Sequence, residues 1–330
     1  MKELYDELIF LVDEDNVGLR LDVYLSAMLA MSREKIKNLF ENNLINSGSI
    51  NNTKQNIKLS QKTTIGDSFT IKIPIKNREK IVKNDKNFAI QDFIVHEDEN
   101  YLIINKPAGL LSQNVDGDEA SVVNLAKEYL GDLAVGQKGR EFLVHRLDKE
   151  TSGLMVLAKN QNSYEFLSHA FKERMVTKKY IGLVWGVPNP ICHSVNKNIV
   201  RDERNRTKMR VSIKKDEGRA SITHYRVKES FFDKAVSLVE FVLETGRTHQ
   251  IRVHMDFLNH GIVGDKLYGR ARNHFFHEDF WDVKRKIDGL NRHMLHSYFL
   301  SLPKIDDPEQ NLEFESELPD DFYAIIDANK

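Results

Sequence analysis

Residues 144–160 read V-H-R-L-D-K-E-T-S-G-L-M-V-L-A-K-N, and this stretch determines how we interpret the rest of the chain. Its polar first half ends at Gly153 and continues as the apolar run Leu154 to Ala158. A short, branched and unbroken apolar run predicts a buried strand, and a polar loop entering such a strand is a common location for functional side chains. Asp148 is also explained by an Asx-turn, in which its side chain bonds to the backbone and has no catalytic role. A second signal is therefore needed before a function is inferred from this stretch.

The second signal is Leu243 to Met255, which reads L-E-T-G-R-T-H-Q-I-R-V-H-M. Together the two stretches resemble the H-R-L-D-x-x-T-S-G and T-G-R-x-H-Q-I-R signatures of the RluA family of pseudouridine synthases, in the family's order. The shorter stretches Asn105–Gly109 (N-K-P-A-G) and Gly264–Gly269 (G-D-K-L-Y-G) are also similar to family motifs. The resemblance implies an α+β fold with a mixed, largely antiparallel sheet and a central cleft.

Composition limits the class of protein. A chain of 330 residues with 41% hydrophobic residues is long enough for two domains. The apolar runs are too short to span a membrane, and the acids in Met1–Glu14 argue against a signal peptide, so we expect a cytoplasmic protein. The single cysteine, Cys192, excludes an internal disulfide and a multi-cysteine metal site, and the histidine spacing matches no metal motif.

The formal net charge of −1 conceals an uneven distribution. Residues 305–329 contain nine acids and no lysine or arginine, and the rest of the chain holds 48 basic against 40 acidic residues. A local basic surface is therefore compatible with the composition, as binding to RNA phosphates requires.

We predict a small α/β domain over residues 17–76, a charged linker over 77–91 and a catalytic domain over 92–330. The apolar spacing from Leu21 and the stripe that follows Ser32 predict two helices, with Ser32 as the cap of the second, and alternation from Phe69 to Ile73 predicts a strand. This domain resembles the small RNA-binding domain named after ribosomal protein S-four. On the second helix Arg33 and Lys37 are then candidate RNA-binding residues, although an ordinary solvated face is the alternative.

Patterning predicts further elements in the catalytic domain. The hairpin Phe93–Val95 with Tyr101–Ile104, the helices Ser121–Leu130 and Ser163–Phe171, and the strands Lys178–Gly186, Thr223–Val227 and Val236–Leu243 follow from apolar periodicity. Within the strand Lys178–Gly186, Tyr180 is out of phase with Ile181, Leu183 and Trp185, so it should face the opposite side of the sheet.

The resemblance implies three catalytic residues that are far apart in sequence. Asp148 matches the family's catalytic carboxylate, as nucleophile or as base, and Arg252 matches its partner. Such a cation would offset the cost of keeping an aspartate ionised in a dry cleft. Tyr180 matches the tyrosine of the K-x-Y motif, which stacks on the uracil and could later take its proton. The alternatives are an Arg252 surface pair with Asp256 and ordinary packing for Tyr180.

Other basic residues are candidate RNA contacts. Residues 196–219 form the most basic long loop, with Arg204, Arg206 and Lys208 at its centre, and we expect it to clamp the RNA backbone rather than to be a solvated hairpin. By the resemblance, Arg146 braces the space left when the target base leaves its stack, and Arg247 belongs to the same RNA-binding set.

The expected reaction is the isomerisation of uridine to pseudouridine in structured RNA, most of all large-subunit ribosomal RNA. The reaction exchanges no electrons with another molecule, so we expect no metal and no small-molecule cofactor, RNA as the partner, and a monomer. Two alternatives stay open: a transfer RNA substrate, and a non-catalytic RNA-binding or ribosome assembly factor with the same fold. Both catalytic readings require Asp148, Tyr180 and Arg252 to converge at one place, whereas a non-catalytic factor has no need of all three.

Overall fold

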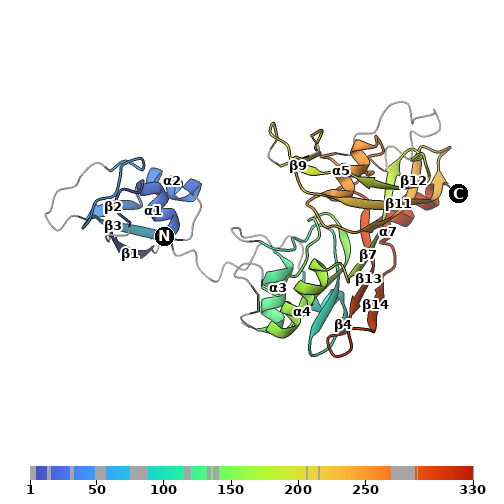
Figure 1. The fold of residues 1–330 in the computed structure, drawn as a ribbon, viewed down its shortest axis with the longest axis horizontal. Coiled ribbons are helices and arrows are strands. Elements are labelled where there is room, and N and C mark those ends of the chain that lie inside the picture. Colours follow the sequence, from blue (N-terminus) through green and yellow to red (C-terminus); the bar gives the residue numbers. More distant parts are fainter. Residues whose placement is uncertain are drawn as a thin grey trace. The chain divides into compact units, whose positions relative to one another are not determined.

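The computed structural model describes residues 5–12, 16–29, 33–48, 57–74, 88–114, 120–131, 135–136, 141–205, 207–214, 216–268, 287 and 289–329. Internal contacts divide the chain into two compact units, residues 1–81 and 82–330. Figure 1 shows both units. Among the helices of these described ranges, none has the length and apolarity needed to cross a bilayer.

The first unit packs two helices on a three-stranded antiparallel sheet of order β1-β3-β2. Its elements are β1 (Tyr5–Leu11), α1 (Leu21–Met28), α2 (Arg33–Glu41), β2 (Ile45–Gly48) and β3 (Ser68–Pro74). The predicted helices and strand are present, and Leu21, Ile36 and Phe69 are buried in one cluster. Met28, which the spacing placed in the apolar stripe, is 46% exposed. The sequence analysis did not predict β1, and the proposed Ser32 cap lies outside the described residues.

The second unit is built on one long sheet of order β4-β5-β6-β13-β7-β12-β11-β8, with β14 paired to β13. Its strands are β4 (Ile94–Glu97), β5 (Tyr101–Lys106), β6 (Ser152–Ala158), β7 (Thr177–Trp185), β8 (Cys192–Asn196), β11 (Ile222–Phe231), β12 (Val236–Leu243), β13 (Leu295–Pro303) and β14 (Asn311–Glu315). Within the described residues only β13 and β6 pair in parallel. The predicted α+β class with a largely antiparallel sheet is confirmed.

The helices predicted at residues 121–130 and 163–171 are present, whereas the last α-helix of this unit was not predicted. The helices are α3 (Val122–Leu130), α4 (Gln161–Lys172), α5 (Gln250–Phe257) and α7 (Asp320–Ile326). Ser121 caps α3, and Asn160 forms a capping box with Ser163 at the start of α4. In Figure 1, α3 and α4 lie beside the β4–β5–β6 part of the sheet, and α5 lies near the opposite part with β11 and β12.

The two faces of β7 belong to different cores, as its alternation predicted. Tyr180 packs in the larger hydrophobic cluster, together with β5, β6 and α5. Ile181, Leu183 and Trp185 pack in a second cluster with the buried side chain of Phe322 from α7. Tyr180 is therefore on the side of the sheet that faces α5, where the second signature lies.

The strand β6 is buried at every position. Its second residue, Gly153, has φ of +116° and lies against the backbone of Ser297, where the Cβ of any other residue would overlap that backbone. Glycine is thus required for the parallel contact between β6 and β13. This contact fixes the turn that carries Asp148, because the turn leads directly into β6.

Two expectations need correction. Much of the predicted 196–219 loop is ordered as a short antiparallel hairpin, in which β9 (Ile199–Arg201) pairs with β10 (Met209–Val211), and its apolar side chains pack against α5 and Tyr268. The second correction concerns the range expected as a linker, because the 3-10 helix Ile90–Phe93 begins inside it and Ile90 is fully buried in the core. Residues 77–87 lie outside the described ranges.

Candidate active site

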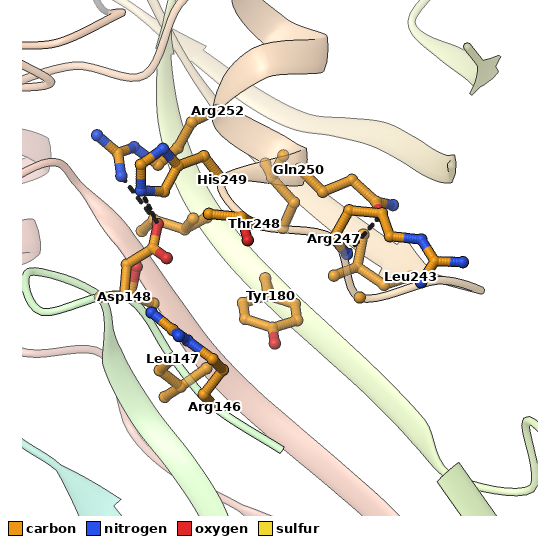
Figure 2. A pocket seen from close by; sticks show the side chains of 14 residues that line it. Arg146, Leu147, Asp148, Tyr180, Leu243, Arg247, Thr248, His249, Gln250 and Arg252 are labelled. Atoms are coloured by element: carbon orange, nitrogen blue, oxygen red, sulfur yellow. Dashed lines mark hydrogen bonds and ion pairs between the residues drawn. The ribbon is translucent and has the colours of Figure 1, made fainter. Parts of the chain in front are cut away.

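Asp148 lies on the turn before β6 and lines a pocket of about 100 Å³. Tyr180 from β7 and Arg252 from α5 line the same pocket, so the structure brings together the three residues that the sequence analysis named. Figure 2 shows Asp148 beside Arg252 and His249 at one side of this pocket, with Tyr180 across from it. Three separate elements thus position one set of polar groups.

Arg252 makes the central contacts of the site. Its Nη1 donates to Oδ2 of Asp148 at 2.8 Å, while Nε and Nη2 donate to the two carboxylate oxygens of Asp265 at 2.6 and 3.0 Å. The Arg252 side chain is only 8% exposed. The alternative of a surface pair with Asp256 is therefore wrong, and Asp265 instead holds the guanidinium in the orientation that meets Asp148.

Asp148 remains a carboxylate in this surrounding. Burial raises its pKa, but the charge that His249 carries when it is protonated, the charge of Arg252 and the hydrogen bond from Arg252 more than reverse this, so the pKa lies below the ordinary value. Burial lowers the pKa of His249, so this ring is neutral at neutral pH. Arg252 is consequently the permanent cation that keeps Asp148 ionised.

His249 and Tyr268 connect this network to the hairpin formed by β9 and β10. His249 stands before α5 in a left-handed conformation, with φ of 56°, and its Nε2 lies 3.9 Å from Oδ2 of Asp148. Its Nδ1 shares a hydrogen bond of 2.9 Å with the Tyr268 hydroxyl, which also accepts one of 2.7 Å from the backbone N–H of Met209 in β10. The Tyr268 ring lies 5.0 Å from the Arg252 guanidinium carbon.

The Asp148 turn is anchored by residues near β13. Thr151 Oγ1 shares a hydrogen bond of 2.7 Å with His293 Nε2, and Ser152 Oγ shares one of 2.8 Å with His296 Nδ1. Arg292 donates to Ser152 Oγ at 2.9 Å and binds Asp321 through two further nitrogen atoms. Burial lowers the pKa of His293 to about 3, so it is a neutral hydrogen-bond partner.

Lys106 supports the same turn from β5. The side chain is fully buried, and its ammonium donates to the carbonyl oxygens of Pro107, Leu110 and Lys149, the last at 3.1 Å. Burial lowers the Lys106 pKa to about 7. The N-K-P-A-G motif thus contributes a structural cation whose carbonyl ligands include the residue next to Asp148.

Tyr180 is buried, with a 7% exposed side chain that faces the pocket. Burial raises the pKa of its phenol, so the hydroxyl is protonated at neutral pH. A neutral aromatic ring at the wall of a pocket is suited to stacking on a flat base.

The candidate RNA-binding residues of the second unit have different positions. Arg146 and Arg247 are exposed and line the pocket. Arg204 is exposed on the turn between β9 and β10, and the Lys208 ammonium lies 5.6 Å from the Tyr268 ring centre. Arg206 lies outside the described residues.

In the first unit both candidate RNA-binding residues make ion pairs. Arg33 binds Asp22 with a shortest distance of 2.5 Å, and Lys37 lies 3.5 Å from Glu41. Both cations are nevertheless mostly exposed, so a face of each remains accessible to solvent.

The sequence analysis did not assign roles to Asp265, Tyr268 or His249. The first two belong to the G-D-K-L-Y-G motif, which was noted only as a family resemblance, and His249 precedes the Q-I-R of the second signature. The sequence signal that could have identified Asp265 and Tyr268 is that an acid and a phenol occur together in a short motif shortly after Arg252 in the chain. Their contacts with Arg252 depend on how residues 265–268 fold back onto α5, which no spacing rule specifies.

Comparison with known proteins agrees with this geometry. A family model described as RNA pseudouridylate synthase matches residues 100–257. A ribosomal large subunit pseudouridine synthase D of Zymomonas mobilis is 33% identical over 95% of this chain and 94% of that protein, and a synthase C of Rickettsia felis is 35% identical over 77% and 82%. The solved structure of human RNA pseudouridylate synthase domain containing 4 matches with a TM-score of 0.56 at 28% identity, covering 72% of this chain and 93% of that one.

The fold and the relatives place this chain among the RNA pseudouridine synthases, which are isomerases. Within that class, the two long signatures and relatives such as these show that it belongs to the RluA family.

Proposed function

We propose that this protein isomerises specific uridines of large-subunit ribosomal RNA to pseudouridine, with Asp148 as the catalytic carboxylate. The observation that carries the proposal is the ionised Asp148 in a pocket whose opposite wall is Tyr180, held by an arginine that is itself fixed by Asp265. A carboxylate oriented before the substrate arrives lowers the barrier by positioning and by charge.

The reaction breaks the bond between ribose carbon one and uracil nitrogen one, turns the base, and joins the same ribose carbon to carbon five. The proton on carbon five is lost and nitrogen one gains one, so no electrons are exchanged and no cofactor is proposed. Asp148 acts on the sugar, either as nucleophile on the anomeric carbon or as base. Tyr180, as a neutral phenol, stacks on the uracil during this turn.

The target uridine must leave its base stack to reach this pocket. Arg146 is exposed next to the Asp148 turn and is the side chain we propose to brace the vacated space. The proposed clamp on the RNA backbone consists of Arg204, Arg206, Lys208 and Arg247.

The ribosomal substrate is supported by the names of the relatives, which are large-subunit ribosomal synthases of types C and D. We propose that residues 17–76 act as a tethered RNA-binding domain, with Arg33 and Lys37 on its RNA face, which raises the effective concentration of the catalytic domain 92–330 at its substrate. We further propose that the enzyme works as a cytoplasmic monomer.

The decisive experiment maps pseudouridines in ribosomal and transfer RNA from cells that lack the protein, and again after a plasmid restores either the wild type or Asp148→Asn. Loss of a large-subunit ribosomal pseudouridine that only the wild type restores is the expected result. Loss of a transfer RNA site would favour the transfer RNA alternative. If no site disappears, or if Asp148→Asn restores it, the protein is an RNA-binding or assembly factor instead.

In vitro, Asp148→Asn should lower kcat/KM by at least about 10³-fold, the equivalent of roughly 4 kcal/mol of barrier, because the amide keeps the shape but loses the charge and the nucleophile. Tritium release from carbon five of the uridine measures the rate. Asp256→Asn makes the same change on an exposed residue of α5 and serves as the control. Comparable rates for Asp148→Asn and the wild type would refute the catalytic assignment.

A further inference from the structure

A second, larger pocket of about 590 Å³ opens beside the candidate active site. The two pockets share Arg146, Tyr180 and Arg247, so they meet at the place where we propose that the target uridine is held. The second pocket extends from there toward α4 and the start of β7. An RNA strand that places one nucleotide in the first pocket can pass a neighbouring nucleotide across this opening.

The lining of the second pocket is strongly cationic. Among its described lining residues are the cations Arg146, Lys172, Arg174, Lys178 and Arg247, against a single acid, Glu244. This acid is already engaged, because its carboxylate lies 3.4 Å from Arg174 and 2.7 Å from His224 Nε2. The excess of positive charge favours an anionic ligand.

Lys178 is the most unusual of these cations. It stands two residues before Tyr180 on β7 and is half-buried, and its ammonium lies 5.1 Å from the ring centre of Phe171. No carboxylate of the described chain lies within ion-pair distance of it. Burial lowers its pKa to about 8, which shows that the surroundings do not compensate the charge. The neighbouring Lys179 instead lies over Phe299 on the other side of the strand.

The Phe171 ring next to the Lys178 ammonium is itself packed against a second ring. The His145 ring stacks on Phe171 with centroids 4.7 Å apart, and His145 Nε2 accepts a hydrogen bond of 3.0 Å from the backbone N–H of Val156. This hydrogen bond ties the ring to β6. The ammonium thus lines the second pocket and lies over the Phe171 ring, which stacks on a ring tied to β6.

We propose that this second pocket binds a phosphodiester group of the RNA next to the target uridine, with Lys178 as the cation that contacts it. This inference rests on the proposed function. A half-buried ammonium without a partner is costly, and a phosphate oxygen offsets that cost whereas a neutral base does not. A lysine ammonium binds a phosphate oxygen as a compact point charge. It does not need the planar guanidinium with which arginine makes paired hydrogen bonds.

The first test compares Lys178→Gln with Lys179→Gln on an RNA that contains the uridine mapped above. Lys178→Gln should raise KM about fivefold at 0.1 M salt, with little change in kcat, and should reduce the slope of log kcat/KM against log salt by about 0.7–0.9, the contribution of one phosphate. Lys179→Gln should match the wild type. An unchanged slope and KM for Lys178→Gln, or a loss confined to kcat, would overturn the inference.

The second test neutralises the phosphate instead of the lysine. RNAs with a methylphosphonate on either side of the target uridine are compared in the wild type and in Lys178→Gln. At one of the two positions the substitution should raise KM for the wild type but not further for the variant, as expected for two groups in contact. Additive losses at both positions would contradict the contact. If the wild-type enzyme forms no pseudouridine in any RNA, the proposed function fails instead, which is a separate result.

Discussion

Asp22 in the first unit and Asp148 in the second are both carboxylates held by arginine, yet their surroundings differ. Asp22 binds Arg20 and Arg33, whose side chains are 51% and 59% exposed. The hydrogen bond from Arg20 is the largest of the effects that lower the Asp22 pKa to about 2. Arg252, the partner of Asp148, is 8% exposed.

The difference lies in what fixes the arginine. Solvent surrounds the outer face of Arg33, so a phosphate can approach it without breaking the fold. Arg252 is instead bound by Asp265, whose side chain is fully buried, and the Tyr268 ring lies against it. The first arrangement allows the arginine to exchange partners and the second keeps one geometry, as the proposed RNA-binding surface and the proposed catalytic centre respectively require.

The largest expected effect comes from breaking the buried arrangement. Arg252→Met leaves Asp148 and Asp265 buried without their cation, which should lower the free energy of unfolding by about 3–5 kcal/mol. We expect pseudouridine formation to fall by at least about 10³-fold, because the pKa of Asp148 rises and its orientation is lost. Urea unfolding and tritium release measure the two effects.

Arg226→Met is the matched control for that change, because Arg226 is exposed on β11. Near-wild-type stability and turnover in Arg252→Met would show that the buried network is not what holds the aspartate.

A smaller effect is expected from Tyr268→Phe, which keeps the ring against Arg252 but removes the hydroxyl that joins His249 to the hairpin. Loss of about 1 kcal/mol of hydrogen bonding should lower kcat roughly fivefold. Tyr323→Phe, an exposed phenol on α7, is the control. An equal kcat in wild type and Tyr268→Phe would mean that the hairpin and the carboxylate are independent.

The smallest effect is expected in the first unit. Arg33→Gln should weaken RNA binding by about two- to fivefold, as for one exposed charge contact, and should reduce the salt slope by about 0.7–0.9. Arg20→Gln is the control. It also leaves Asp22 with one arginine, so its effect on stability should match, but Arg20 lies outside α2. Filter binding measures the affinity of each variant for RNA. Equal affinities of the two variants would show that Arg33 is not part of the RNA-binding face.

Much of the fold was predictable because the periodicity of apolar residues in the sequence coincides with the burial of their side chains in the structure. The run Leu154–Ala158 is a fully buried strand, and the opposite phases of Tyr180 and Ile181 correspond to two separate cores. The strand β1 was missed, and one reason is that the acidic Asp6 and Glu7 interrupt its apolar pattern. The hairpin at residues 199–211 was considered only as the alternative to a clamp loop, because its strands have three residues each, too few for a period to be recognised.

For the candidate site, the sequence identified the residues but not the contacts that orient them. The convergence of Asp148 and Arg252, which are 104 residues apart, was expected only through family resemblance. Asp265 was recognised as part of a motif, yet nothing in its spacing indicates a bidentate contact with α5. Lys178 is the first residue of the K-x-Y motif, but the motif does not indicate its distinction from Lys179, which depends on which neighbours surround each ammonium in space.

The anchoring of the Asp148 turn has a consequence for synthesis of the chain. The hydrogen bonds that join Thr151 and Ser152 to Arg292, His293 and His296 span 140 to 144 residues. A nascent polypeptide therefore exposes its catalytic aspartate long before the ribosome has translated the residues that immobilise it. If Asp148 is the catalytic carboxylate proposed above, competence to modify RNA is acquired only after β13 has emerged, and we expect incomplete chains with an intact signature motif not to act on RNA.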